Sequence, residues 1–125
     1  MGGQRIPKCD GRPETYGTLD EASSALGMAR ASAVRPKTKE IILSIQKDLL
    51  LLGAELAILP EDSASFSFQI TANHVEWLEK WIEELQEEVA LGREFIYPGA
   101  TLSSAAIDLA RTIIRRAERC AVRLM

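Results

Sequence analysis

The last part of the chain carries a cluster of basic side chains around one acid, Glu118: Arg111, Arg115, Arg116, Arg119 and Arg123. At about 3.6 residues per turn, a helix places Arg111, Arg115 and Glu118 on one face. Glu118 could pin a neighbouring arginine, and a pinned, planar guanidinium suits bidentate contact with phosphate oxygens. The spacing alone leaves open a solvent-exposed face with ion pairs between neighbouring turns.

The charge balance limits which anion these arginines could bind. The 125 residues carry a formal net charge of −3, and a local cationic cluster on a mildly acidic protein fits a small anionic ligand better than nucleic acid. No apolar run approaches the ~20 residues that span a membrane, and no signal peptide is visible. We therefore expect a cytoplasmic protein with no membrane partner.

Cysteine and histidine usage argues against a metal centre. Cys9 and Cys120 are far apart in sequence, and His74 is the single histidine. Reduced bystander thiols are favoured over a disulfide or a metal site. We predict no protein metal ligands.

Two further charged positions have a functional and a structural interpretation. Lys8 and Arg12 stand just before an expected helix, whose N-terminal N–H groups could help them to cradle an anion. The alternative is a polar lead-in. Asp20 lies inside that helix, where Asp is unfavourable, so it either has a partner elsewhere or is a surface carboxylate.

Phe95 and Tyr97 precede the turn signal Pro98-Gly99. Two aromatic rings held at a rigid turn could line a ligand pocket. The alternative is that they pack under the body of the protein.

Apolar periodicity and capping signals predict helices over about 13–34, 37–59, 71–90 and 101–125. Pro36 should end the first helix, and Thr71 and Thr101 should cap the third and fourth. The fourth shows no stop signal by Met125. Residues 61–70 read as a loop, although 65–68 alternate like a short strand.

In the third helix an apolar stripe should face inward: Val75, Leu78, Trp81 or Ile82, Leu85 and Val89. Its glutamates should face water rather than bind metal, because no E-x-x-H is present: Glu83, Glu84, Glu87 and Glu88.

Four long helices with short loops predict one all-α domain, residues 1–125, folded as an antiparallel up-and-down bundle of the ferritin-like kind. The second helix is apolar on several sides, from Leu49 to Leu52 all round, which predicts burial on more than one side. Asp20 and Arg111 lack obvious partners in the sequence. Closure into a homotrimer would bury both features.

Four segments occur in the order that one known family shows: R-P-E-T-Y-G-T-L-D-E-A-S-S-A-L-G (12–27), I-Q-K-D-L-L-L-L-G-A-E-L-A (45–57), F-I-Y-P-G (95–99) and A-R-T-I-I-R-R-A-E-R (110–119). Over essentially its whole length the chain resembles the propanediol-utilisation type of ATP:cob(I)alamin adenosyltransferase. The resemblance implies a homotrimer with ATP and the corrin bound between subunits. It also implies transfer of the 5′-deoxyadenosyl group of ATP to the Co(I) of cobalamin, with Mg²⁺ on the phosphates. Adenosylcobalamin and triphosphate would be the products.

The resemblance also implies roles for single residues. Lys8 and Arg115 would contact ATP phosphate, and Glu118 the nucleoside. Asp20 and Arg111 would bridge subunits beside the active site.

Phe95 would lie against the corrin and help to displace the lower axial cobalt ligand. A cobalamin reductase or a B12-dependent enzyme is the partner that such an activity implies.

Some family features are missing. The N-terminal T-x-x-G-D-x-G phosphate loop and a C-terminal helix with an N-R-L-S-D-like stretch are absent, so we expect a longer parent protein with a fifth helix. Ser23, Ala100 and Asp108 stand where the family usually has Asn, Gly and His. The competing hypothesis is a non-enzymatic helical-bundle module that binds an anionic partner through the arginine face.

Overall fold

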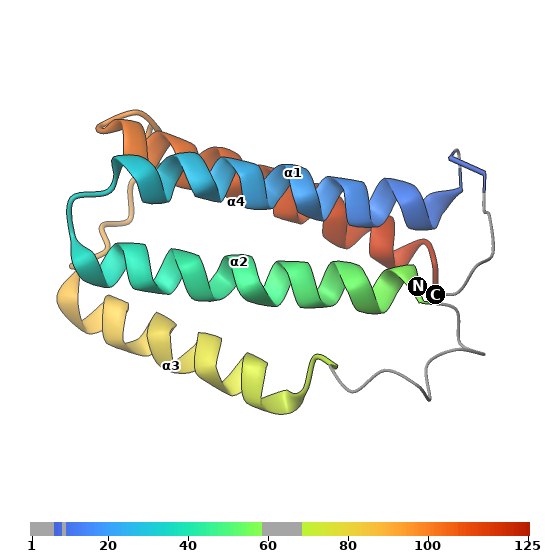
Figure 1. The fold of residues 1–125 in the computed structure, drawn as a ribbon. Helices are drawn as coiled ribbons and strands as arrows, with labels where there is room; N and C mark the ends of the chain where they lie inside the picture. Colours follow the sequence, from blue (N-terminus) through green and yellow to red (C-terminus); the bar gives the residue numbers. More distant parts are fainter. Residues whose placement is uncertain (1–6, 9, 59–68) are drawn as a thin grey trace.

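In the part of the chain that the computed structural model describes, residues 7–8, 10–58 and 69–125, four α-helices and no strand are present. In chain order they are α1 (Gly11–Ser32), α2 (Pro36–Ala57), α3 (Ala72–Glu88) and α4 (Leu102–Val122). They run alternately up and down; α1 packs against both α2 and α4, and α3 lies along the outer side of α2 (Figure 1). The expected all-α antiparallel bundle is confirmed. The strand-like stretch 65–68 lies outside the described residues.

Two helices begin at the threonines that the sequence indicates. At α4, Thr101 Oγ1 accepts a hydrogen bond from the N–H of Ser104, and Ser104 Oγ accepts one from the N–H of Thr101, both at 3.0 Å. Each of these two side chains thus accepts from a backbone N–H that has no partner within the first helical turn. At α3, the N–H of Thr71 donates to Nδ1 of His74 at 3.0 Å. Both expected N-terminal caps are confirmed.

Two helix ends differ from expectation. α1 ends at Ser32, and Pro36 is the first residue of α2 instead of the residue that stops α1. Proline fits that position because the first turn of a helix needs no N–H from it. α4 ends at Val122 with Arg123 as its C-cap, so the expected run to Met125 is wrong by about one turn.

Alanines form much of the contact between α1 and α4. The core cluster consists of Ala22, Ala25, Leu26, Ala29, Ile42, Ala106, Ala110 and Ile113. Small side chains let two helix axes approach closely, since the interaxial distance depends on the residues at the contact. Along α1 the apolar residues at spacings of three and four, Leu19, Ala22, Leu26 and Ala29, are buried, and Tyr16 is half-buried.

Helix α3 contributes no buried residue, which corrects the expected inward stripe. Its apolar side chains are 39–54% exposed: Val75, Leu78, Ile82, Leu85 and Val89. On α2, Ile42 is the one buried residue, while Leu50 is 73% exposed. A single chain therefore does not provide the burial on several sides that α2 was expected to have.

A polar seam joins α3 to α2 instead. Lys37 forms ion pairs with Glu84, at 3.5 Å, and with Glu88. Its ammonium nitrogen lies 5.1 Å from the centre of the Trp81 ring. Two of the four glutamates expected to face water are therefore engaged, because the Lys37 side chain reaches across from the first turn of α2 to both.

Candidate active site

Helix α4 separates its small apolar residues from its basic ones. The side chains buried in α4 are Ala106, Ala110, Ile113, Ala117 and Cys120. Their spacing of three and four fixes how the helix is rolled against the core. Arg111, Arg115 and Glu118 are consequently exposed. The structure thus places this arginine face, defined by these three residues, on the solvent side of α4.

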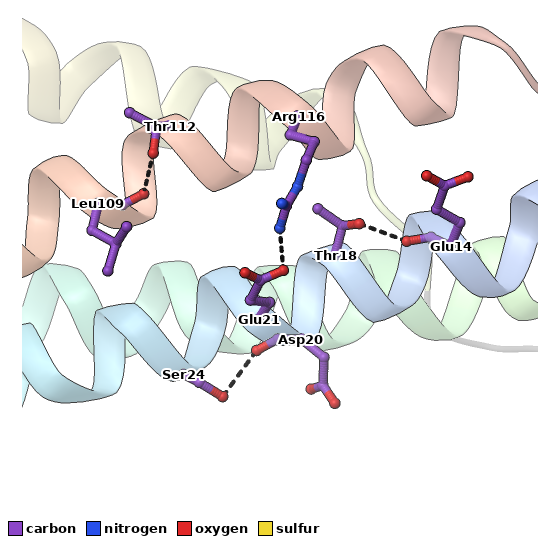
Figure 2. A network of polar contacts seen from close by, with 8 residues as sticks. All are labelled: Glu14, Thr18, Asp20, Glu21, Ser24, Leu109, Thr112 and Arg116. Carbon is purple, nitrogen blue, oxygen red and sulfur yellow. Dashed lines mark hydrogen bonds and ion pairs between the residues drawn. The ribbon is translucent and has the colours of Figure 1, made fainter.

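An ion pair between Arg116 of α4 and Glu21 of α1 joins the two helices (Figure 2). Both side chains are about half exposed, so the pair contributes little to stability. It does show that Arg116 faces α1. This pair was not predicted from the sequence, although the Arg115-Arg116 doublet is visible there.

Arg111 and Asp20 are not paired within one chain. Arg111 Nε donates to Asp108 Oδ1 at 2.9 Å. The carboxylate of Asp20 points away from α4 (Figure 2), and it forms no ion pair with any residue that the structure describes. Each therefore keeps hydrogen-bonding capacity that the described residues of its own chain do not use.

Asp20 lies at the rim of a groove of about 390 Å³ between α1 and α2. The remaining walls are largely apolar: Tyr16, Leu19, Ser23, Leu49, Leu50, Gly53, Ala54 and Ala57. An unpaired carboxylate beside an apolar groove could pair with a cationic side chain of another molecule whose surface covers the groove.

Glu118 does not pin an arginine as its spacing suggested. It forms no ion pair in the described part of the chain. Arg119 Nη1 instead donates to the carbonyl oxygen of Arg115 at 3.0 Å. Arg115 and Glu118 thus both present free charged groups on the arginine face.

The lead-in to α1 is less open to an anion than its sequence suggested. Asp10 Oδ1 accepts from the N–H of Arg12 at 3.0 Å, so a carboxylate already caps the helix N-terminus. Arg12 Nη1 donates to the carbonyl oxygen of Ile58, just past the end of α2, at 3.2 Å. Lys8 stays exposed beside an open hollow of about 520 Å³, which it lines with Pro13, Glu14 and Tyr16.

Phe95 is 99% exposed in the segment between α3 and α4. Tyr97 is 90% exposed, so the alternative that these rings pack under the bundle is wrong for a single chain. The turn that follows has Gly99 at φ +118°, a backbone conformation that favours glycine. The sequence therefore fixes a corner that presents an apolar surface to solvent.

The candidate residues are spread along the bundle. The α3–α4 segment with Phe95 lies at the end where α1 finishes, and Lys8 precedes the start of α1 at the other end (Figure 1). Arg115 is about 20 Å along α4 from Leu102, at 1.5 Å per residue. One chain therefore does not gather all of these residues at one point.

Comparison with known proteins identifies the family. All of residues 1–125 match the family described as cobalamin adenosyltransferase. A corrinoid adenosyltransferase of Citrobacter freundii is 38% identical over 119 residues, which are 95% of this chain and 68% of that relative. The chain belongs to the cobalamin adenosyltransferase family. The resemblance found in the sequence is thereby confirmed.

Other relatives in this adenosyltransferase family are longer than this chain and are matched over only part of their length. The corrinoid adenosyltransferase PduO of Citrobacter freundii is 37% identical over 98% of this chain but only 36% of its own length. The corrinoid adenosyltransferase of Bacillus subtilis is 36% identical and is matched over 64% of its length. This chain thus spans between about a third and two thirds of the curated relatives named.

Solved adenosyltransferase structures share the fold. A variant of the PduO-type ATP:corrinoid adenosyltransferase from Lactobacillus reuteri, complexed with cobalamin and ATP, has a TM-score of 0.85 and 34% identity. That match covers 99% of this chain and 70% of the other. A second variant of that enzyme, complexed with ATP, has a TM-score of 0.84 and 32% identity, with 100% and 71% covered.

Two features are absent from the described residues. No helix there is long and apolar enough to cross a membrane. Nor do three or more His, Cys, Asp or Glu side chains come together there as metal ligands would.

Proposed function

We propose that this family member transfers the 5′-deoxyadenosyl group of ATP to the Co(I) of cobalamin, giving adenosylcobalamin and triphosphate. The observation that carries the proposal is the likeness, at a TM-score of 0.85, to a relative complexed with both substrates. The arginines of the exposed arginine face of α4 supply the positive charge that the leaving triphosphate of such a reaction needs.

The chemistry divides the work between substrate and protein. A Co–C5′ bond forms and the C5′–O bond to triphosphate breaks, with Co(I) as the nucleophile, so no protein base is required. The protein positions C5′ over cobalt and stabilises the leaving triphosphate. Arg115 and Lys8 hold phosphate oxygens, and Glu118 contacts the nucleoside. We place Mg²⁺ on the phosphates, as the family resemblance implies.

Phe95 serves the corrin side of the reaction. Its exposed ring offers apolar surface at a corner whose backbone favours glycine. Against cobalamin, such a ring excludes water and the lower axial ligand of cobalt, which makes Co(II) easier to reduce. The expected reducing partner is a cobalamin reductase, and a B12-dependent enzyme would take the product.

We infer that the working form is a closed homotrimer. In one chain the candidate residues lie towards opposite ends of the bundle, and Asp20 points away from its own α4. Cyclic closure brings Arg111 of one copy to Asp20 of the next and covers exposed apolar residues such as Leu50. Sedimentation at micromolar concentration tests this, and a stable monomer would exclude the trimer.

We place the protein in the cytoplasm. Its substrate ATP is available there, and a thiol such as that of Cys120, which is free and buried, stays reduced in that compartment.

An anaerobic assay with ATP, Mg²⁺ and chemically reduced cobalamin tests the activity. We expect adenosylcobalamin and triphosphate in equal amounts, and a loss of both in Arg115→Ala. Calorimetry with ATP, with and without Mg²⁺, separates binding from transfer. A chain that fails to bind ATP would favour the non-enzymatic module whose arginine face takes another anionic partner.

A further inference from the structure

Asp108 contacts Arg111, one residue of the arginine face of α4. Asp108 Oδ1 accepts from Nε of Arg111 at 2.9 Å, three residues apart on the helix. Guanidinium has five N–H donors, one on Nε and four on the terminal nitrogens. The terminal nitrogens of Arg111 make no hydrogen bond or ion pair with a described residue.

Arg116 is held in a different way. It uses a terminal nitrogen, Nη2, for Glu21 of α1, and Nη2 belongs to both bidentate edges of a guanidinium. Arg111 is held by Nε alone, which leaves the edge between its two terminal nitrogens free. The edge between the two terminal nitrogens matches a carboxylate in bidentate geometry.

We propose that Asp108 is a positioning residue for Arg111. It fixes the guanidinium through Nε and turns the terminal amino groups outward, toward the Asp20 carboxylate of a second copy. The inference rests on the proposed function, because the proposed trimer is what brings Asp20 to Arg111. A long side chain that is already ordered loses less conformational freedom when it pairs.

The test compares three single variants by sedimentation equilibrium and by the kinetics of adenosyl transfer. Asp108→Ala removes the acceptor, and Asp108→Asn keeps an acceptor oxygen without the charge. Glu79→Ala is the matched control, since Glu79 is an exposed carboxylate of α3 without an ion pair among the described residues. We expect Asp108→Ala to weaken association about three- to tenfold, the scale of ordering one long side chain. Asp108→Asn and Glu79→Ala should stay close to wild type.

A double variant isolates the action through Arg111. In an Arg111→Ala background, Asp108→Ala should weaken association no further. Thermal midpoints of the Asp108 single variants should fall only by what their weaker association accounts for, because one exposed pair contributes little to folding.

The outcomes separate this proposal from the function on which it rests. Unchanged or tighter association in Asp108→Ala would overturn it, as would an undiminished effect without Arg111. A wild-type monomer would overturn it together with the trimer. A trimer that responds to Asp108 but transfers no adenosyl group would uphold the positioning role and reject the activity.

Discussion

Arg115 and Arg116 are neighbours in sequence but face different surroundings. Arg116 forms an ion pair with Glu21 of α1, whereas Arg115 is exposed on α4 and has no carboxylate partner in the described part of the chain. Two adjacent side chains of one type therefore have separate roles, one between helices and one available to a ligand.

Arg115→Ala should lower kcat/KM by about 30- to 1000-fold and leave the fold intact. The loss of a charge-assisted contact to the leaving triphosphate costs about 2–4 kcal/mol in the transition state. Arg116→Ala is the matched control: it should keep most of the activity and lose less than about 1 kcal/mol of stability. Anaerobic kinetics and thermal melts measure both. Equal kinetics of the two variants would mean that Arg115 is only a surface residue.

Phe95→Ala should leave ATP binding nearly intact and impair formation of four-coordinate Co(II)alamin. A methyl group cannot exclude water and the lower cobalt ligand as a ring does. The defect should be smaller when cobalamin is supplied as Co(I), because that ligand has then already left. Electronic or magnetic resonance spectra of bound Co(II)alamin with ATP provide the measurement. If the variant keeps the four-coordinate signal, Phe95 has no part in displacing the ligand.

The seam between α2 and α3 should depend on pH at both extremes. The hydrogen bond with Glu88 raises the pKa of Lys37 above 10.5, and the same bond lowers the pKa of Glu88 below 4.5. The Glu88 contribution is present above 4.5 and is lost as pH falls through the lowered pKa. The Lys37 contribution is present below 10.5 and is lost as pH rises through the raised pKa.

Tryptophan fluorescence can follow this seam, because the chain has two tryptophans, Trp77 and Trp81, and both belong to α3. We expect a flat signal at intermediate pH and a change at each extreme. Lys37→Gln should remove both changes. A signal in Lys37→Gln that still follows the wild-type pH profile would show that other groups hold α3.

Where local chemistry or a regular repeat decides the structure, the sequence predicted it well. Thr71 and Thr101 cap helices because their partners are three residues away. The outward placement of Arg111 and Arg115 follows from the buried positions around them, Ala110, Ile113 and Ala117. The face of α4 that packs against the core could therefore be inferred without knowledge of any other helix.

Contacts across helices were not accessible in this way. The stripe of Val75, Ile82 and Val89 is apolar at helical spacing, yet Lys37 orients α3 through a different face. One local pair was also missed: Asp108 stands three residues before Arg111 on the same helix, whereas the sequence prediction named Asp20 as the partner of Arg111. Charge pairing depends on side-chain reach, which residue spacing alone does not give.

Gly17→Ala should stabilise the folded chain and weaken its association. No atom lies within 4 Å of a Cβ built at Gly17, and alanine is favoured over glycine in a helix by about 1 kcal/mol. Gly17 is exposed and lies one turn from Asp20, where the proposed trimer brings another copy. Gly27→Ala is the control, because the nearest atom, Gln46 Nε2, is at an ordinary 3.5 Å. Association that is unchanged in Gly17→Ala would place the second copy elsewhere.

The alanine contact between α1 and α4 has a thermodynamic consequence. Of the buried apolar residues in the described chain, only Leu19, Leu26, Ile42 and Ile113 are large aliphatic ones. Stabilisation scales with the apolar area removed from water, so a core of methyl groups gives one copy little reserve against unfolding. In the proposed trimer, melting and dissociation then become a single event governed by mass action. The melting temperature should rise with protein concentration, and its slope would measure how far each copy depends on its neighbours to stay folded.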